Sequence, residues 1–207
     1  MISPLHAILD VETASSRGWD PLDLARAFLD GGARVIQIRA KRLASGPLLQ
    51  VCDRLVQAAA ARQAAVIVND RADLTAMAGA AGVHVGQDDL APLAARDLLG
   101  PGAVVGVSTH TAEQVEAAVM EPVSYVAVGP VFGTRTKATG YEAVGLDLVR
   151  QAVRRAHGLP IVAIGGITIE RAPAVIEAGA TAVAVISDLL TGNDPAARVR
   201  AFLDALS

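Results

Sequence analysis

The chain of 207 residues is 52% hydrophobic and 19% charged, and its 18 basic and 21 acidic side chains give a formal net charge of −3. A mean hydropathy of +0.42 excludes intrinsic disorder, which requires low hydrophobicity and high net charge. The acidic balance argues against a nucleic-acid partner, and no apolar run reaches the ~18 residues of a membrane span. The single cysteine, Cys52, cannot form an internal disulfide. These features predict a soluble, cytoplasmic globular protein with no membrane partner.

Eight short aliphatic runs recur along the chain. Each run is apolar over nearly its whole length, which is typical of strands buried on both faces of a parallel sheet. The runs cover residues 6–9, 34–38, 65–68, 82–85, 103–107, 125–128, 160–164 and 182–186.

Helix signals separate these runs. Asp20-Pro21 and Asp194-Pro195 each place an acidic N-cap before a proline at the first helical position. Thr111 followed by Gln114 is a capping-box pattern. Because no linker or shift in composition divides the chain, eight strand–helix units predict an α/β fold: a single-domain (β/α)8 TIM barrel over residues 1–207. An open doubly wound sheet is the alternative, but no glycine fingerprint follows the first strand.

Polar clusters follow the predicted strands. In a (β/α)8 barrel the loops at the carboxyl ends of the strands build the active site, so these clusters are expected to converge on one rim. They are Gln37-Ile-Arg39-Ala-Lys41, Asn69-Asp70, Gln87-Asp88-Asp89, Ser108-Thr-His110, the loop 129–140, Gly165-Gly166-Ile-Thr168 and Ile186-Ser187-Asp188.

Charged residues in these clusters suit a phosphorylated substrate. Arg39 and Lys41 share one side of an extended segment and offer a guanidinium fork and a point charge to phosphate oxygens, although a solvated strand end has the same pattern. Asp70 and Asp89 follow neighbouring strands, and two carboxylates opposite cations suit Mg²⁺ together with substrate phosphate oxygens. Asp88 is a substitute ligand or a solvated residue. Capping the next helix is the alternative role for Asp70 and for Asp89.

Two further segments are candidates for the rim. Gly165-Gly166, with Thr168 at a predicted helix start, lets backbone N–H groups approach an anion, whereas a tight strand-to-helix turn would need no ligand. The loop 130–140 is long and rich in glycine and threonine, which suggests a lid over an anionic substrate. The alternative is an ordered connector anchored by Pro130 and Phe132.

The four histidines show no metal-ligand spacing. His84 alternates with valines inside a strand and is expected to be an internally bonded core or rim residue. His110, after Ser108, is a weaker candidate for the site, and His6 shows no pattern that predicts a role.

Several ordered motifs carry a resemblance. They are Gln37-x-Arg39-x-Lys41, Val68-Asn69-Asp70, Gly82-x-His84-x-Gly86-Gln87-x-Asp89, Gly106-x-Ser108, Gly129-Pro130, Thr134-x-Thr136-Lys137 and Ile164-Gly165-Gly166-Ile167. Together they resemble the thiamine-phosphate synthase family over nearly the whole chain.

The resemblance implies a transferase with two small-molecule substrates. It would join 4-amino-2-methyl-5-(diphosphooxymethyl)pyrimidine to 4-methyl-5-(2-phosphoethyl)thiazole, giving thiamine phosphate and diphosphate. Departure of diphosphate would leave a pyrimidine-methyl cation, which the thiazole nitrogen captures. Such a reaction needs electrostatic stabilisation of a departing polyanion more than a strong base.

The resemblance also implies ligand sets, carried over position by position. The aminopyrimidine would contact Gln37 and Asn69. Mg²⁺ would bind Asp70 and Asp89. The diphosphate would be held, and its departure assisted, by Arg39, Lys41, Ser108 and Lys137. The thiazole phosphate would be held by Thr134, Thr136, Gly166, Ile186 and Ser187.

Some positions depart from the family pattern. Ala40 replaces a frequent acid, Gly133 replaces a proline, and the segment 140–142 lacks a proline, so loop closure and thiazole specificity are less defined. A thiazole tautomerase of the same fold is the main alternative, but Pro130 stands where its histidine commonly lies. A non-catalytic sensor of thiamine precursors is a third interpretation. The many aliphatic residues leave a homo-oligomer open.

Overall fold

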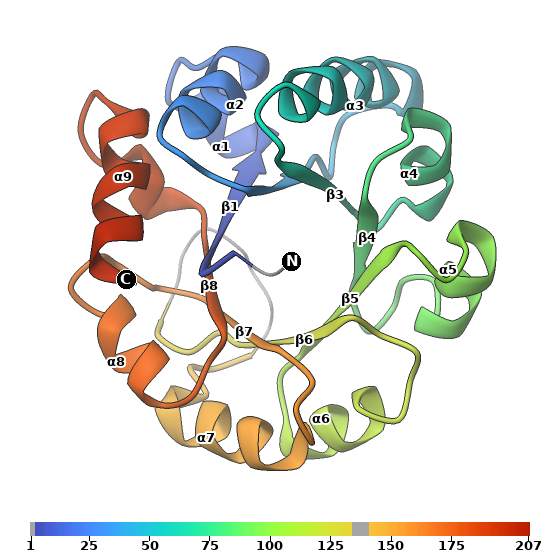
Figure 1. The fold of residues 1–207 in the computed structure, drawn as a ribbon, viewed down its shortest axis with the longest axis vertical. Coiled ribbons are helices and arrows are strands. Elements are labelled where there is room, and N and C mark those ends of the chain that lie inside the picture. Colours follow the sequence, from blue (N-terminus) through green and yellow to red (C-terminus); the bar gives the residue numbers. More distant parts are fainter. Residues whose placement is uncertain (1–2, 134–140) are drawn as a thin grey trace.

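A computed structural model describes residues 3–133 and 141–207. Eight parallel strands form a closed barrel in which each strand pairs with the next along the chain and β8 pairs with β1 (Figure 1). The closure confirms the predicted (β/α)8 barrel and excludes the open sheet. The strands are β1 (Leu5–Asp10), β2 (Val35–Arg39), β3 (Ala65–Asn69), β4 (Gly82–Val85), β5 (Val104–Thr109), β6 (Tyr125–Val128), β7 (Ile161–Ile164) and β8 (Ala182–Val185).

Helices surround the barrel (Figure 1). As predicted, the carboxylates of Asp20 and Asp194 cap helices, accepting from the backbone N–H of Leu22 and Ala197 at 2.9 Å each. The helices are α1 (Val11–Ser16), α2 (Pro21–Asp30), α3 (Ser45–Ala60), α4 (Ala72–Ala78), α5 (Pro92–Leu99), α6 (Ala112–Ala118), α7 (Gly145–Arg155), α8 (Ala172–Glu177), the short 3-10 helix η1 (Ser187–Leu190) and α9 (Pro195–Ala205).

The predicted capping box of α6 is only half formed. The Thr111 hydroxyl accepts from the Gln114 N–H at 3.2 Å. The Gln114 side chain, however, accepts from the N–H of His110 at 2.7 Å, one residue before the cap. The end of β5 is thereby tied to the start of α6.

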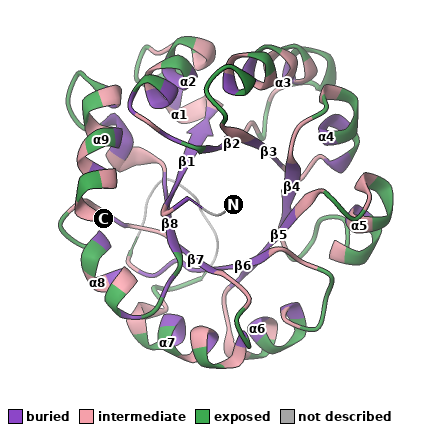
Figure 2. Ribbon diagram, viewed as in Figure 1, coloured by how far each residue is buried: buried purple, intermediate pink, exposed green. Residues whose placement is uncertain are grey.

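The core has two layers because successive strand side chains point to opposite faces. Leu5, Ala7 and Leu9 of β1 pack in the larger layer between strands and helices. The intervening Ile8 packs inside the barrel against small side chains such as Ala127 and Ala184. Figure 2 shows the strands buried over most of their length and the helices buried on their inner faces. This rigid scaffold fixes the strand ends that carry the site.

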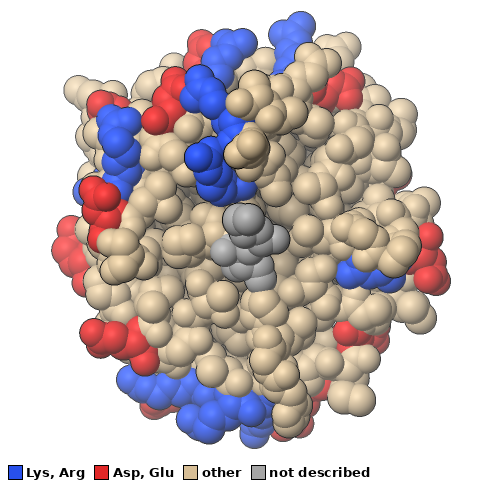
Figure 3. All heavy atoms as spheres, viewed as in Figure 1, with Lys and Arg blue, Asp and Glu red and all other residues tan. Residues whose placement is uncertain are grey.

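The surface agrees with the composition. In the part of the chain that the structure describes, no helix has both the length and the hydropathy of a membrane span. Figure 3 shows acidic and basic side chains around the margin of one face and a basic group that extends from its upper edge toward the middle, while most of the face carries neither.

Candidate functional site

Two neighbouring cavities open at the carboxyl ends of the strands. The β5–β8 cavity, of about 230 Å³, is lined from the ends of β5, β6, β7 and β8. The β2–β5 cavity, of about 210 Å³, is lined by residues that follow β2, β3, β4 and β5. Ser108 and His110 line both cavities. The polar clusters therefore converge on one rim as predicted, and they divide between two adjoining spaces.

The two candidate metal ligands lie in the β2–β5 cavity. Asp70 has a left-handed backbone (φ 65°), a conformation that aspartate tolerates better than most residues. Burial raises the pKa of Asp70, and the nearby Asp89 carboxylate raises it further, while an ion pair with Lys41 opposes both effects. A half-buried acid whose pKa rises beside a second carboxylate, next to a cation, forms a site that suits a divalent ion.

Neither acid caps a helix, so the alternative role is wrong for both. The N-cap positions of α4 and α5 are Arg71 and Ala91, and neither helix has a side-chain cap. The Asp89 carboxylate instead accepts from the backbone N–H of Gly86 at 2.8 Å, within its own loop.

The two candidate aminopyrimidine ligands are brought together. The Gln37 side-chain amide donates to the Asn69 side-chain oxygen at 3.3 Å. Gln37 is buried inside the barrel, whereas Asn69 lines the β2–β5 cavity. Each amide has both donors and acceptors, so the pair can match the mixed hydrogen-bonding edge of an aminopyrimidine.

An aspartate that sequence reasoning missed holds Arg39. Arg39 donates from Nη1 to Asp10, whose side chain is only 3% exposed. Asp10 also caps α1 by accepting from the Thr13 N–H at 2.9 Å. The available signal was its place at the end of β1, where parallel pairing sets it beside Arg39.

Ser108 is fixed at two atoms. Its carbonyl accepts from the Gln87 side chain at 2.6 Å, and its hydroxyl lies 2.8 Å from Nε2 of His84. His84 also contacts the Tyr125 hydroxyl through Nδ1 at 2.9 Å. The prediction that His84 is an internally bonded residue is confirmed. Its partner Tyr125 was not identified from the sequence.

The glycine turn borders the β5–β8 cavity. Gly165 and Gly166 have φ of +105° and +61°, which side-chain-bearing residues rarely adopt. A Cβ on Gly166 would lie 2.6 Å from the Gly133 carbonyl oxygen. The placement of Thr168 at a helix start is wrong, because α8 begins at Ala172 and the turn occupies the intervening residues. The candidate donors to an anion are therefore the backbone N–H groups of the turn, and no helix N-terminus adds to them.

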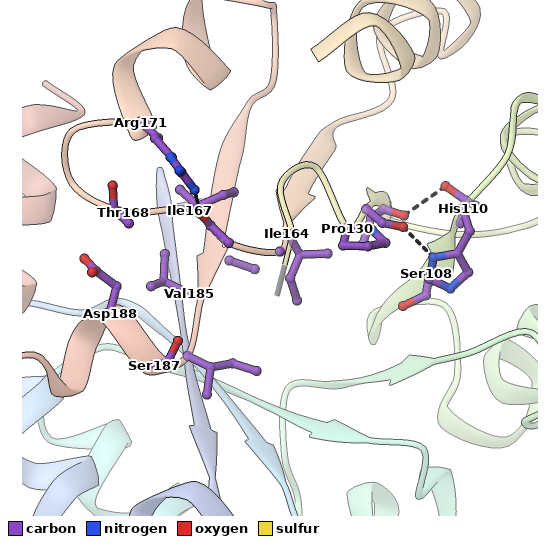
Figure 4. Close-up of a pocket in the computed structure, with 18 residues that line it drawn as sticks. Ser108, His110, Pro130, Ile164, Ile167, Thr168, Arg171, Val185, Ser187 and Asp188 are labelled. Carbon is purple, nitrogen blue, oxygen red and sulfur yellow. Dashed lines mark hydrogen bonds between the residues drawn. The ribbon is translucent and has the colours of Figure 1, made fainter. Parts of the chain in front are cut away.

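Figure 4 shows polar groups on two sides of this cavity, with Ser108 and His110 opposite Thr168, Arg171 and Ser187. Ile186 and Ser187 stand at the start of η1, since β8 ends one residue before its predicted end. Arg171 was missed: its Nη1 donates to the Gly166 carbonyl at 2.9 Å, and its guanidinium lies 4.8 Å from the centre of the Phe132 ring.

The predicted lid lies largely outside the described residues, as do Thr134, Thr136 and Lys137. Its first residues are described and are held by the end of β7. The N–H of Val131 donates to the Ile164 carbonyl at 2.8 Å, and the N–H of Phe132 donates to the Gly165 carbonyl at 3.0 Å. These backbone bonds anchor the base of the loop, as the connector alternative requires, and the lid itself stays a prediction.

Comparison with known proteins places these residues in a family. The sequence pattern of the family described as thiamine monophosphate synthase (TMP-TENI) matches residues 7–189, from β1 to η1. The chain belongs to the thiamine monophosphate synthase family. The resemblance noted in the sequence is thereby confirmed, and the match spans every strand end that lines the two cavities.

Relatives in the thiamine monophosphate synthase family are similar over most of their length. A thiamine-phosphate synthase of Anaeromyxobacter dehalogenans is 46% identical over 191 residues, covering 91% of this chain and 85% of the relative. One of Koribacter versatilis is 45% identical, covering 98% and 95%. The solved thiamine phosphate pyrophosphorylase from Pyrococcus furiosus superposes with a TM-score of 0.87 at 26% identity, covering 98% of this chain and 94% of that one.

Proposed function

We propose that this protein is a thiamine-phosphate synthase. The observation that carries the proposal is the pair of cavities that share Ser108 and His110. One cavity gathers two amides, three acids and a lysine, and the other has a glycine turn beside Ser187. Two different phosphorylated substrates can lie side by side there with their reacting ends at the shared wall. The names of the relatives support the same reaction.

The β2–β5 cavity is assigned to the pyrimidine diphosphate. Gln37 and Asn69 offer amide donors and acceptors to the aminopyrimidine. Lys41 and the Ser108 hydroxyl reach the same space and can hold the diphosphate. Arg39, paired with Asp10, lines neither cavity, and its role as a second cation for the diphosphate rests on the family resemblance. The further role of Lys137 rests on the family resemblance alone.

The β5–β8 cavity is assigned to the thiazole phosphate. The backbone of Gly166 and of Ile186, together with the Ser187 hydroxyl, presents donors to a phosphate. Thr134 and Thr136 complete this set only by resemblance. Arg171 adds a positive charge at the same end of the cavity, where the Asp188 carboxylate is already paired with Arg198 at 2.7 Å.

The acid pair fits Mg²⁺, which takes one or two protein carboxylates and completes its shell with water and substrate phosphate oxygens. Among the described residues no group of three or more His, Cys, Asp or Glu could hold a metal, so the substrate has to supply ligands. Asp70 and Asp89 would hold the ion, which when bound stabilises the charge of the diphosphate. The raised pKa of Asp70, caused by burial and by the nearby Asp89 carboxylate, supports this assignment.

The residues of the protein would then promote a substitution in which the methylene group exchanges its bond to the diphosphate oxygen for a bond to the thiazole nitrogen. The methylene–oxygen bond breaks, and the electron pair leaves with the diphosphate toward Arg39, Lys41 and Ser108. The thiazole nitrogen attacks the resulting pyrimidine-methyl cation from the adjoining cavity. Because both substrates are held at the Ser108 wall, the reaction needs no protein nucleophile or base.

Turnover decides the proposal. Purified protein is incubated with both substrates, with Mg²⁺ or with excess chelator, and thiamine phosphate and diphosphate are measured. Formation of both products only with Mg²⁺ is expected. Asp89→Asn should abolish turnover without unfolding the protein, whereas Asp97→Asn, on the exposed side of α5, should not. Isomerisation of a thiazole phosphate alone would indicate the tautomerase, and binding of both substrates without turnover would indicate the sensor.

We further propose a cytoplasmic location, with small-molecule substrates and Mg²⁺ as the ligands of the site and no nucleic-acid or membrane partner. Cys52 is buried, and burial raises the pKa of its thiol to about 11, so the thiol stays protonated and unreactive. A lone, inert thiol suits a reducing compartment. A homo-oligomer remains a prediction to be measured by light scattering.

A further inference from the structure

Three interior residues form a hydrogen-bonded chain that ends at the wall between the two cavities. The Tyr125 hydroxyl lies 2.9 Å from Nδ1 of His84, and Nε2 of His84 lies 2.8 Å from the Ser108 hydroxyl. Tyr125 is 2% exposed, and His84 and Ser108 are each 7% exposed. The tyrosine end is therefore shielded from water, whereas His84 lines the β2–β5 cavity and Ser108 lines both cavities.

A missing side chain makes this contact possible. His84 on β4 and Tyr125 on β6 are not on adjacent strands, and Gly106 of β5 is the register partner of both. A Cβ on Gly106 would lie 2.1 Å from Cζ of Tyr125. The tyrosine ring therefore lies across the glycine and brings its hydroxyl to the histidine. This gives a physical reason for the Gly106-x-Ser108 motif.

The buried tyrosine restricts where the protons of the chain can lie. Among the described residues the Tyr125 hydroxyl has one hydrogen-bond partner, Nδ1 of His84. A buried hydroxyl that donates no hydrogen bond destabilises the folded state, because the hydrogen bond that it made to water is not replaced. If Nδ1 carried a proton, it would occupy the tyrosine oxygen as a donor and leave the tyrosine proton without an acceptor. Burial also raises the pKa of Tyr125, so its proton stays in place.

We propose that Tyr125 fixes His84 in the Nε2–H tautomer and so directs the hydroxyl proton of Ser108 into the site. Tyr125 donates to Nδ1, and Nε2–H donates to the Ser108 oxygen. In the described structure Ser108 Oγ has no other partner, so its own proton is available to an anionic oxygen of the substrate. The opposite tautomer would make Ser108 donate to His84 and turn only lone pairs toward an anion.

This inference rests on the proposed function for its consequence in catalysis. The Ser108 hydroxyl becomes an oriented donor to the departing diphosphate, and no reorientation is required as negative charge develops. Tyr125 and His84 are positioning residues, since they act through Ser108. The rings of His6 and Tyr125 pack edge to face with their centres 5.3 Å apart, but His6 makes no hydrogen bond to Tyr125, His84 or Ser108.

Nitrogen NMR of the full-length protein with ¹⁵N-labelled histidine tests the tautomer directly. The wild type should show His84 protonated on Nε2 and unprotonated on Nδ1. Tyr125→Phe should lose this preference. His6→Phe, which alters packing on the same ring, should keep it. A wild-type spectrum with the proton on Nδ1, or on both nitrogens, would overturn the proposal even if every variant failed to fold.

A double-mutant cycle tests the route through Ser108. Tyr125→Phe should lower kcat/KM for the pyrimidine diphosphate about tenfold, the typical effect of one lost hydrogen bond at a charged group. In a Ser108→Ala background the same change should have no further effect, because its target is gone. If the two losses in kcat/KM multiply, Tyr125 acts independently of Ser108 and the proposed route is refuted. Failure of the wild type to form thiamine phosphate would refute the proposed function, and the nitrogen spectrum would still decide the tautomer.

Discussion

Replacing Asp10 by asparagine should expose how strongly Arg39 depends on its partner. The two side chains are 3% and 15% exposed, so the guanidinium would lose its counter-ion in a site that water hardly reaches. Removing one member of a buried ion pair costs ~3–5 kcal/mol. Asparagine keeps an oxygen that can accept from the N–H of Thr13, so the cap of α1 is preserved. The measured loss of stability then reports the missing negative charge alone. Because Arg39 retains some exposure, we expect the lower end, about 3 kcal/mol.

Urea unfolding followed by the single tryptophan measures this loss, since Trp19 packs against the core. Asp10→Asn combined with Arg39→Met should recover most of the stability, because the uncompensated charge is gone. It should not recover turnover, because the methionine cannot hold a diphosphate. Asp10→Asn alone should also lower kcat/KM about tenfold, through a misplaced guanidinium. A double variant as unstable as Asp10→Asn would refute the buried-charge explanation, and a loss below about 1 kcal/mol would show that the pair is effectively solvated.

Two other predictions concern stability against pH and the division of the site. Burial lowers the pKa of His6 to about 4 from 6.5, so below pH 6.5 the unfolded chain takes up a proton that the folded chain refuses, and stability should fall by roughly 3 kcal/mol as the pH drops toward 4. His6→Phe should remove this slope in urea titrations, and parallel curves for the two proteins would contradict the assignment. Gly166→Val should weaken binding of the thiazole phosphate at least about tenfold in calorimetry, because the new side chain meets Gly133 and Phe132, while the pyrimidine diphosphate binds as before. Weakening of the pyrimidine diphosphate alone would reverse the assignment of the two cavities.

The barrel could be predicted because its strands are buried on both faces. Such strands are continuous apolar runs, and the structure differs from the predicted limits by a residue or two at most ends. The start of α8 could not be predicted. Two glycines signalled a turn, but the number of residues between that turn and the first helical bond depends on the packing of Gly166 against Phe132 and Gly133. That contact joins two loops far apart in sequence.

The rim residues were predictable one by one, whereas their partners were not. Asp70 and Lys41 follow strands and were identified by position, and the structure pairs them. Asp10 could have been found from the parallel pairing of β1 with β2, which sets it opposite Arg39. Tyr125 gave no such signal, because its contact with His84 crosses an intervening strand. Only the closed barrel shows that a glycine on that strand leaves room for two rings.

The residue types at positions 106 and 125 are coupled in evolution, because a side chain at 106 and a tyrosine at 125 cannot be present together. Any side chain at 106 would overlap the ring at its far end, so a lineage can add one only after it has given up the tyrosine. That earlier step removes the hydroxyl next to His84. Divergence at this layer of the barrel must therefore pass through an intermediate that lacks both the ring and the side chain, and the two positions should change together when family sequences are compared.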